Sequence, residues 1–279
     1  MKINVDRMRQ VLVLSYPMKY QVLFLISVSL IIISHSSSAR VLTVAESINK
    51  AGQQRMLTQR IAKNYLTIAN GIFRSESNKE LKKSIAVFED NLALLSLSMV
   101  DEGSRNALSE LKKSWTFYHQ LVLTRPNKEN TDKVFKGNTK LLGIANSLVI
   151  SLENYANKSG AKLVNISGRQ RMLSQRIALY YFASYIGYKD DIYHQQLYSA
   201  VKEFDHALVT LMNAKENTVE ISESLIKVQK QWDFYKPKFD NIDSVSYIPR
   251  MMKIITEKIL NDMDDITNLY EKNLSAVYQ

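Results

Sequence analysis

Apolar residues recur along most of the chain at the three- and four-residue spacing that is typical of amphipathic helices. The sequence has only 8 Gly and 4 Pro in 279 residues, which favours long helices joined by few, short turns. Ser77 with Glu80 has the pattern of a capping box, and Asp101 is a suitable N-cap for the next helix. The pattern predicts an all-α fold with helices at about 42–73, 77–100, 102–124, 130–157, 160–187, 191–213, 217–238 and 249–277.

The chain repeats itself. Residues 48–62 read INKAGQQRMLTQRIA and residues 164–178 read VNISGRQRMLSQRIA, with ten of fifteen positions identical at a separation of 116 residues. A WxFY motif further along recurs at a separation of 117, and Tyr155 and Tyr270 give a weaker match at 115. An internal repeat of this length indicates two copies of one structural module.

The two modules are predicted to span residues 42–158 and 159–279, with four helices in each. Four helices joined by short loops favour an up-down bundle, so we expect two tandem four-helix bundles. The Asn-Lys-Ser-Gly stretch at 157–160 leaves two arrangements open. A sharp turn there would lay the first helices of both modules side by side, whereas a continuous helix would stack the modules end to end.

Residues 1–39 have the order of a signal peptide: basic residues, then an apolar run at 22–33, then small residues that end at Ala39. The apolar run is shorter than the ~20 residues that a spanning helix needs. We therefore expect cleavage after Ala39 and a periplasmic protein. The alternative is an uncleaved helix that anchors the protein to the inner membrane.

Composition narrows the function classes. The net charge is +10, but the sequence has no dense Lys/Arg run and no aromatic-basic ribbon, so we expect no nucleic-acid partner. There is no Cys, and the 4 His residues are scattered, so we expect no metal site. No nucleophile–base set or phosphate loop is found, which argues against an enzyme and predicts no catalytic residues and no cofactor.

The repeated helix has two faces that favour burial. One face carries Leu57, Ile61 and Tyr65, an ordinary bundle core. The opposite face carries glycine, arginine and glutamine, although a glycine within a helix is unfavourable and a buried arginine is costly unless it is paired. No acidic residue lies one turn away on that face. We therefore predict an external oxyanion as the ligand, bound by Gly52, Arg55, Gln59, Gly168, Arg171 and Gln175.

A structural alternative stays open for the arginines. Arg55 can pair with a carboxylate from another helix, such as Glu89, with Asp205 as the counterpart in the second copy. Its long side chain can also reach solvent. In either case the motif would serve packing rather than ligand binding.

The repeated motif resembles the signature of PilJ-type sensory modules, the N-terminal domains of type IV pilus chemotaxis transducers. It is also similar to the first helix of bacterial nitrate/nitrite sensor kinases. The resemblance implies a four-helix bundle, with nitrate or nitrite bound where two first helices meet across a dimer. The arginine three residues after the glycine would hold the anion, which corresponds to Arg55 and Arg171 here.

Family modules usually lie between two membrane helices and feed a signalling domain, so we expect this chain to pass its signal to a membrane-bound signalling protein. Because both copies lie in one chain, our hypothesis is an internal pseudo-dimer in which Arg55 and Arg171 face one anion. If the modules stack end to end, the anion site would need a second chain, in a homodimer. The competing function is a helical protein–protein interaction scaffold that has lost ligand binding.

Overall fold

The computed structural model describes residues 41–99, 101–188, 191–240 and 248–277. These residues form eight helices and no strand, which confirms the predicted all-α class for this part of the chain. The predicted signal peptide, residues 1–39, lies outside the described residues. The helices are α3 (Val44–Ala69), α4 (Arg74–Ser98), α5 (Glu102–Leu123), α6 (Lys128–Ala156), α7 (Ser159–Tyr185), α8 (Asp191–Met212), α9 (Val219–Asp240) and α10 (Pro249–Val277).

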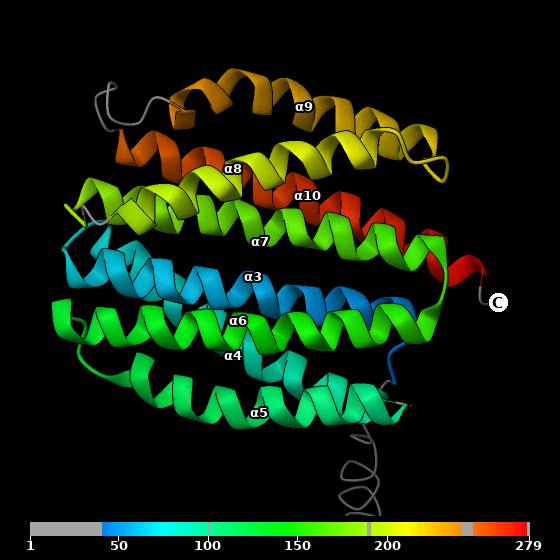
Figure 1. The fold of residues 1–279 in the computed structure, drawn as a ribbon, viewed down its shortest axis with the longest axis horizontal. Helices are drawn as coiled ribbons and strands as arrows, with labels where there is room; N and C mark the ends of the chain where they lie inside the picture. The colour runs from blue at the N-terminus through cyan, green and yellow to red at the C-terminus, as the bar shows by residue number, and fades with distance from the viewer. Residues whose placement is uncertain (1–40, 100, 189–190, 241–247, 278–279) are drawn as a thin grey trace, which may run out of the picture. The chain divides into compact units, whose positions relative to one another are not determined.

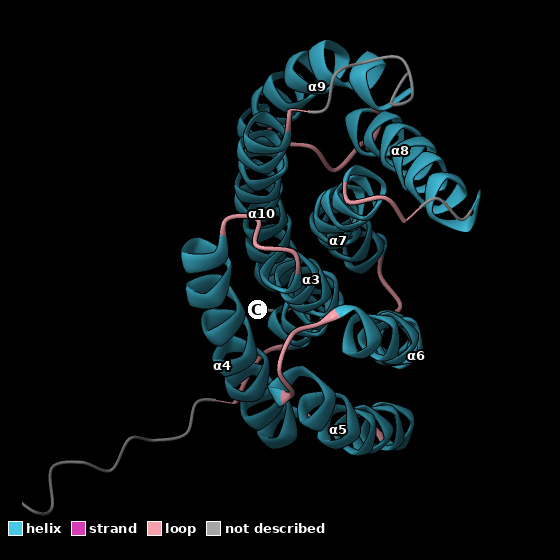
Figure 2. Ribbon diagram, turned by 90° about the vertical axis from the view of Figure 1, so that its left-hand side faces the viewer, coloured by secondary structure: helices cyan, strands magenta, loops and turns pink. Residues whose placement is uncertain are grey.

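Successive helices run in opposite directions, so the odd-numbered helices are parallel to one another (Figure 1). Within the first set of four, α3 packs against α4 and α6, and α5 packs against α6. The second set repeats this with α7 against α8 and α10, and α9 against α10. Seen along the helices, α3 and α7 lie next to one another in the middle of the body (Figure 2). The two sets therefore share one continuous core, whose central contact is α3 on α7.

Both faces of the first helices are buried, as their sequence predicts. Leu57, Ile61 and Tyr65 of α3 are at most 3% exposed, and Arg55 and Gln59 on the opposite face are 1% exposed. Such a helix can only be stable at the centre of the body, because it has no polar side to present to water. The seam between α3 and α7 is thus where the buried polar residues of the repeat meet.

One predicted helix start is wrong. Ser77 is not an N-cap: α4 begins at Arg74, and Ser77 lies one turn inside it, where its hydroxyl accepts a hydrogen bond from Thr67 Oγ1 at 2.9 Å. Phe73, at φ 47°, makes the turn before the helix. Asp101 is confirmed as an N-cap, because its carboxylate accepts from the backbone N–H of Ser104 at 2.8 Å.

The fourth helices of the two modules align at a separation of 118 residues. Tyr155 is 49% exposed and Tyr270 is 2% exposed, so the pairing of these two tyrosines is wrong. Buried Leu152 is the true counterpart of Tyr270. The same separation relates buried Val134, Leu141, Ala145, Leu148 and Ala156 of α6 to buried Met252, Ile259, Met263, Ile266 and Leu274 of α10.

A tight turn between α6 and α7 decides the arrangement of the modules. α6 ends at Ala156, Asn157 takes a left-handed conformation with φ 46°, and α7 begins at Ser159. The backbone N–H of Asn157 donates to Glu153 O at 3.0 Å and closes the helix end. Because the chain reverses here, α3 and α7 lie side by side, and the end-to-end arrangement is wrong. No helix within the described ranges has an apolar stretch long enough to cross a bilayer.

Replacing Asn157 should reveal the strain in this turn. Asn157→Ala should lower the free energy of unfolding by about 1 kcal/mol, because alanine adopts the left-handed conformation less readily than asparagine. Asn157→Gly should keep or raise it, because glycine adopts this conformation without steric cost. Urea unfolding of the three proteins measures the difference, and equal stability of the two variants would contradict the expectation.

Candidate functional site

The first helices cross closely at their two glycines. A Cβ atom on Gly52 would lie 4.0 Å from the Cα of Gly168, and 3.4 Å and 3.6 Å from the Nη2 atoms of Arg171 and Arg55. Both guanidinium groups therefore reach the same place, well within the ~10 Å over which they could share one small ion. The predicted convergence of Arg55 and Arg171 in one chain is present.

Arg55 is fully buried and bonded only to neutral acceptors. Its Nη1 donates to the side-chain oxygen of Asn146 on α6 at 3.0 Å, and its Nη2 donates to the backbone carbonyl of Asn165 on α7 at 3.1 Å. Its Nε is buried and has no partner. Among the described residues, Arg55 makes no ion pair, as the sequence predicts. Glu89 lies 3.4 Å from His119 instead, and Asp205 accepts from Trp232 and Lys236.

Arg171 makes the equivalent contacts, but with a carboxylate. Its Nη2 donates to the side-chain and backbone oxygens of Asn49 on α3, at 2.7 Å and 3.3 Å. Its Nη1 forms an ion pair with Asp264 of α10. The prediction that both arginines lack an acidic partner is therefore wrong for Arg171. The sequence concealed the pairing because Asp264 lies 93 residues away on another helix.

On each side of the crossing, the asparagine that accepts from the arginine also donates to a glutamate on a fourth helix. The amide nitrogen of Asn49 donates to Glu271 of α10 at 2.5 Å, and that of Asn165 donates to Glu153 of α6. Asn49 and Asn165 occupy equivalent positions of the repeat, as do the two glutamates on the fourth helices. The seam therefore follows an approximate two-fold symmetry, and each fourth helix is bonded to the first helix of the other module.

The charge of Arg55 is held in an unfavourable environment. The pKa of its guanidinium is lowered to about 9, first by burial and then by the nearby positive charges of Arg169 and Arg171, which Glu153 and Glu203 partly offset. A buried cation without a bonded anion costs free energy because nothing replaces its hydration. An oxyanion in contact with Arg55 would relieve that cost.

The two glutamines are less alike than their repeat suggests. Gln59 Nε2 donates to Asn138 of α6 at 3.2 Å, and its buried Oε1 has no partner. Gln175 Oε1 instead accepts from Lys63 Nζ at 2.8 Å. Lys63 could not be found from the repeat, because Leu179 occupies the equivalent position in the second copy.

Lys63 connects the seam to a cluster of ion pairs. It is 2% exposed and lies 2.8 Å from Glu257 of α10, which also contacts Arg60 at 2.7 Å. Burial alone would raise the pKa of Glu257, but the charges of Lys63 and Arg60 outweigh it and lower the pKa to about 2. This cluster fixes α10 of the second module against α3 of the first.

Comparison with protein families identifies both modules. The PilJ family, described as "Type IV pili methyl-accepting chemotaxis transducer N-term", matches residues 37–132 and 154–248. The chain belongs to the PilJ family. Comparison with curated proteins and with solved structures gave no match. PilJ modules are helical sensor domains of chemotaxis transducers and are typically non-catalytic, so this chain is a tandem of two sensor modules.

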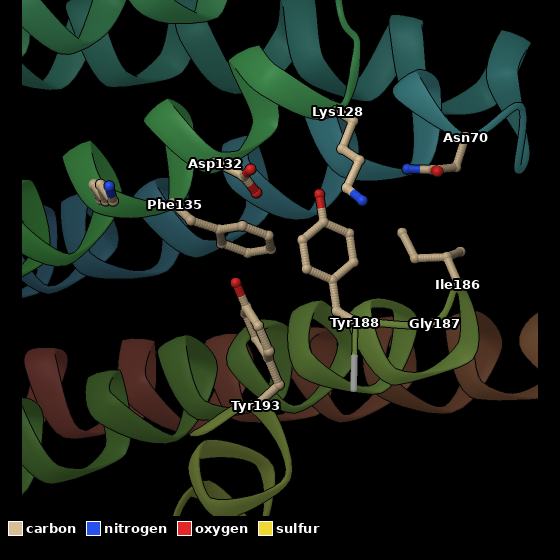
Figure 3. A pocket seen from close by; sticks show the side chains of 9 residues that line it. Asn70, Lys128, Asp132, Phe135, Ile186, Gly187, Tyr188 and Tyr193 are labelled. Carbon is tan, nitrogen blue, oxygen red and sulfur yellow. The ribbon is translucent and has the colours of Figure 1, made fainter. Parts of the chain in front are cut away.

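Two hollows in this PilJ tandem lie away from the paired arginines. One, of about 470 Å³, is lined by Lys128, Asp132, Phe135, Tyr188 and Tyr193 (Figure 3). Its rings pack on one another, with centroids 5.3–5.9 Å apart, and form an aromatic part of its wall. The other, of about 220 Å³, has Asp264 in its wall. Neither Arg55 nor Arg171 lines either hollow.

The glycines at the crossing should not tolerate a methyl group. A Cβ on Gly168 would lie 3.0 Å from the Nη2 of Arg171, which cannot move freely because Asn49 and Asp264 hold it. Gly168→Ala should therefore lower the free energy of unfolding by about 1–3 kcal/mol, as overpacking does.

Gly143→Ala is the matched control for this substitution. Gly143 lies within α6, and a Cβ there would meet nothing within 4 Å. This variant should be more stable by about 0.5–1 kcal/mol, because alanine favours the helix. Chemical unfolding compares the two, and equal gains in stability would show that the crossing does not need its glycine.

Glu257 should make the fold sensitive to acid. Its pKa is lowered in the folded state, so its contribution to stability is complete above the ordinary value of 4.5 and is lost as the pH falls towards about 2. The loss should be about 3 kcal/mol, since each pKa unit corresponds to ~1.4 kcal/mol.

Measuring the free energy of unfolding from about pH 6 to about pH 2 tests this prediction, because the loss falls within that interval. Glu257→Gln should be less stable near neutral pH and should lose less stability on acidification. Glu129→Gln removes an exposed pair with Lys133 and should change the pH profile little. A Glu257→Gln profile parallel to that of the unaltered protein would contradict the assignment.

Proposed function

We propose that this chain is a sensor that binds one small oxyanion, such as nitrate or nitrite, between Arg55 and Arg171. The arrangement that the resemblance implies for two chains, with first helices side by side, exists here within one chain. The family match supports the sensory role, and the identity of the anion comes from the resemblance to nitrate/nitrite sensors.

The observation that carries the proposal is the state of Arg55. Its guanidinium is 1% exposed, and it is bonded to an amide and a carbonyl rather than to a carboxylate. A guanidinium presents parallel N–H donors that suit planar oxyanions, and the unpartnered Nε atoms of both arginines leave donors for them. The glycines let the helices approach closely enough for both arginines to contact one ion.

The contacts of the seam support a route by which binding could be transmitted. Arg55 is bonded to Asn146 on α6, and Arg171 to Asp264 on α10, so an anion that draws on either arginine changes how the fourth helices are held. We propose that a membrane-bound signalling protein reads this change in the periplasm, after export directed by residues 1–39. An uncleaved segment 1–39 would instead hold the sensor at the inner membrane, and association into a homodimer would bring two seams together.

A scaffold without a ligand is the second candidate. Asp264 already neutralises Arg171, and the two hollows described above do not reach either arginine. In a protein that kept the PilJ fold only for protein–protein contacts, we would expect the polar side chains of the seam to bond to one another in this way.

Anion titration separates the two candidates. Nitrate or nitrite at a hundredfold excess over its dissociation constant should stabilise the folded state by about 2.7 kcal/mol, seen as a rise in Tm, and should give heat in calorimetry. Titration with sulfate, which is larger and carries two negative charges, tests whether the site selects anions by size and charge. Arg55→Lys should weaken nitrate binding about tenfold or more, because lysine keeps the charge but loses the planar donors.

Arg74→Lys is the control, because Arg74 is an exposed arginine at the start of α4. It should leave nitrate binding unchanged. Absence of heat and of a Tm shift with nitrate, nitrite and sulfate alike would favour the scaffold.

A further inference from the structure

The two halves of the seam differ at one position of the fourth helices. The separation of 118 residues that aligns the buried faces of α6 and α10 also pairs Asn146 with Asp264. Asn146 accepts from Nη1 of Arg55, and Asp264 pairs with Nη1 of Arg171. The repeat thus holds two equivalent arginines, one opposite an amide and the other opposite a carboxylate.

Asp264 lies between the buried arginine and the outside. Its side chain is 38% exposed, whereas that of Arg171 is 0% exposed. Asp264 also lines the hollow of about 220 Å³, whose wall includes Arg60, Glu80 and Lys83. Arg60 and Lys83 offset the negative charges of Glu80 and Asp264 in this wall, so the hollow is not closed to a small anion. An anion that approaches Arg171 from this hollow meets the carboxylate of Asp264 first.

A carboxylate has the same features as the proposed ligand: it is planar, carries one negative charge and offers two oxygens to a guanidinium. We propose that Asp264 is a built-in competitor for the anion, and that a bound anion displaces it from Arg171. This inference rests on the proposed function of the seam. Asp264 therefore sets the anion affinity, and its release reports binding to α10.

The asymmetry gives the proposal a specific form. Arg55 has no bonded carboxylate to compete with the anion, so capture between both arginines requires only the Arg171–Asp264 pair to open. The apparent affinity is reduced by the fraction of molecules in which that pair is closed. Removing the carboxylate should remove this reduction.

The natural difference between the halves supplies the variants. Asp264→Asn gives the second half the residue of the first, and it should tighten nitrate binding about ten- to hundredfold, the range expected for losing one competing charge-assisted hydrogen bond. Asn146→Asp places a carboxylate opposite Arg55, and it should weaken nitrate binding about tenfold or more. The double exchange moves the carboxylate from one half to the other and should restore an affinity near that of the unaltered protein.

Asp265→Asn is the matched control. It removes the same charge from the next residue of α10, at an exposed position, and should leave the affinity unchanged. Isothermal titration of the full chain with sodium nitrate measures all five proteins. Because Asp264→Asn leaves Arg171 without its ion pair, thermal unfolding without nitrate verifies that each protein is folded, and the Asn146→Asp protein gives an independent arm.

Each outcome of the titrations supports or overturns the inference. Tighter binding by Asp264→Asn, with Asp265→Asn unchanged, supports the inference. Nitrate binding of equal strength by the unaltered protein and Asp264→Asn overturns the inference and leaves the proposed function intact. Binding by Asp264→Asn alone supports the competitor role while refuting anion binding by the unaltered chain. No binding by any folded protein overturns both.

Discussion

The fold depends on bringing two buried guanidinium groups to one helix crossing. A buried arginine is tolerated only when its donors find acceptors and its charge is balanced. The chain meets this for the charge of Arg171, which pairs with Asp264, but only in part for Arg55, whose bonded acceptors are an amide and a carbonyl. Glycines at the crossing provide the space. Packing, polarity and symmetry of the central helices all follow from this requirement.

Duplication within one chain lets the two halves diverge where a symmetric dimer could not. In a dimer of identical chains, a carboxylate opposite one arginine would appear opposite the other as well. Here Asn146 and Asp264 differ, and Lys63 has Leu179 as its counterpart. The ion pairs of Glu257 with Lys63 and Arg60 accordingly have no equivalent among the described residues of the other half. The shared framework is symmetric, and the charges placed on it are not.

Much of the fold and part of the candidate site could be predicted from the sequence, and the predictions that were wrong have physical causes. Periodicity located every described helix, and the repeated motif located the seam, because both signals are local. The partner of Arg171 could not be predicted: which residue of α10 faces the seam depends on its register, and the tyrosine match at 115 gave a register three residues off. Ser77 failed as a cap because the left-handed turn at Phe73 starts the helix earlier. The repeat could not reveal Lys63, because its counterpart in the second copy is the apolar Leu179.

The turn at Asn157 has a consequence for how such a receptor responds. When two modules on separate chains must meet to form a pocket, its occupancy depends on how many copies the cell makes. A covalent connection makes that encounter intramolecular, at an effective concentration in roughly the millimolar range for short linkers. The seam between α3 and α7 therefore forms at any copy number of the chain, and in the sensor proposed above the anion site would not depend on the meeting of two chains.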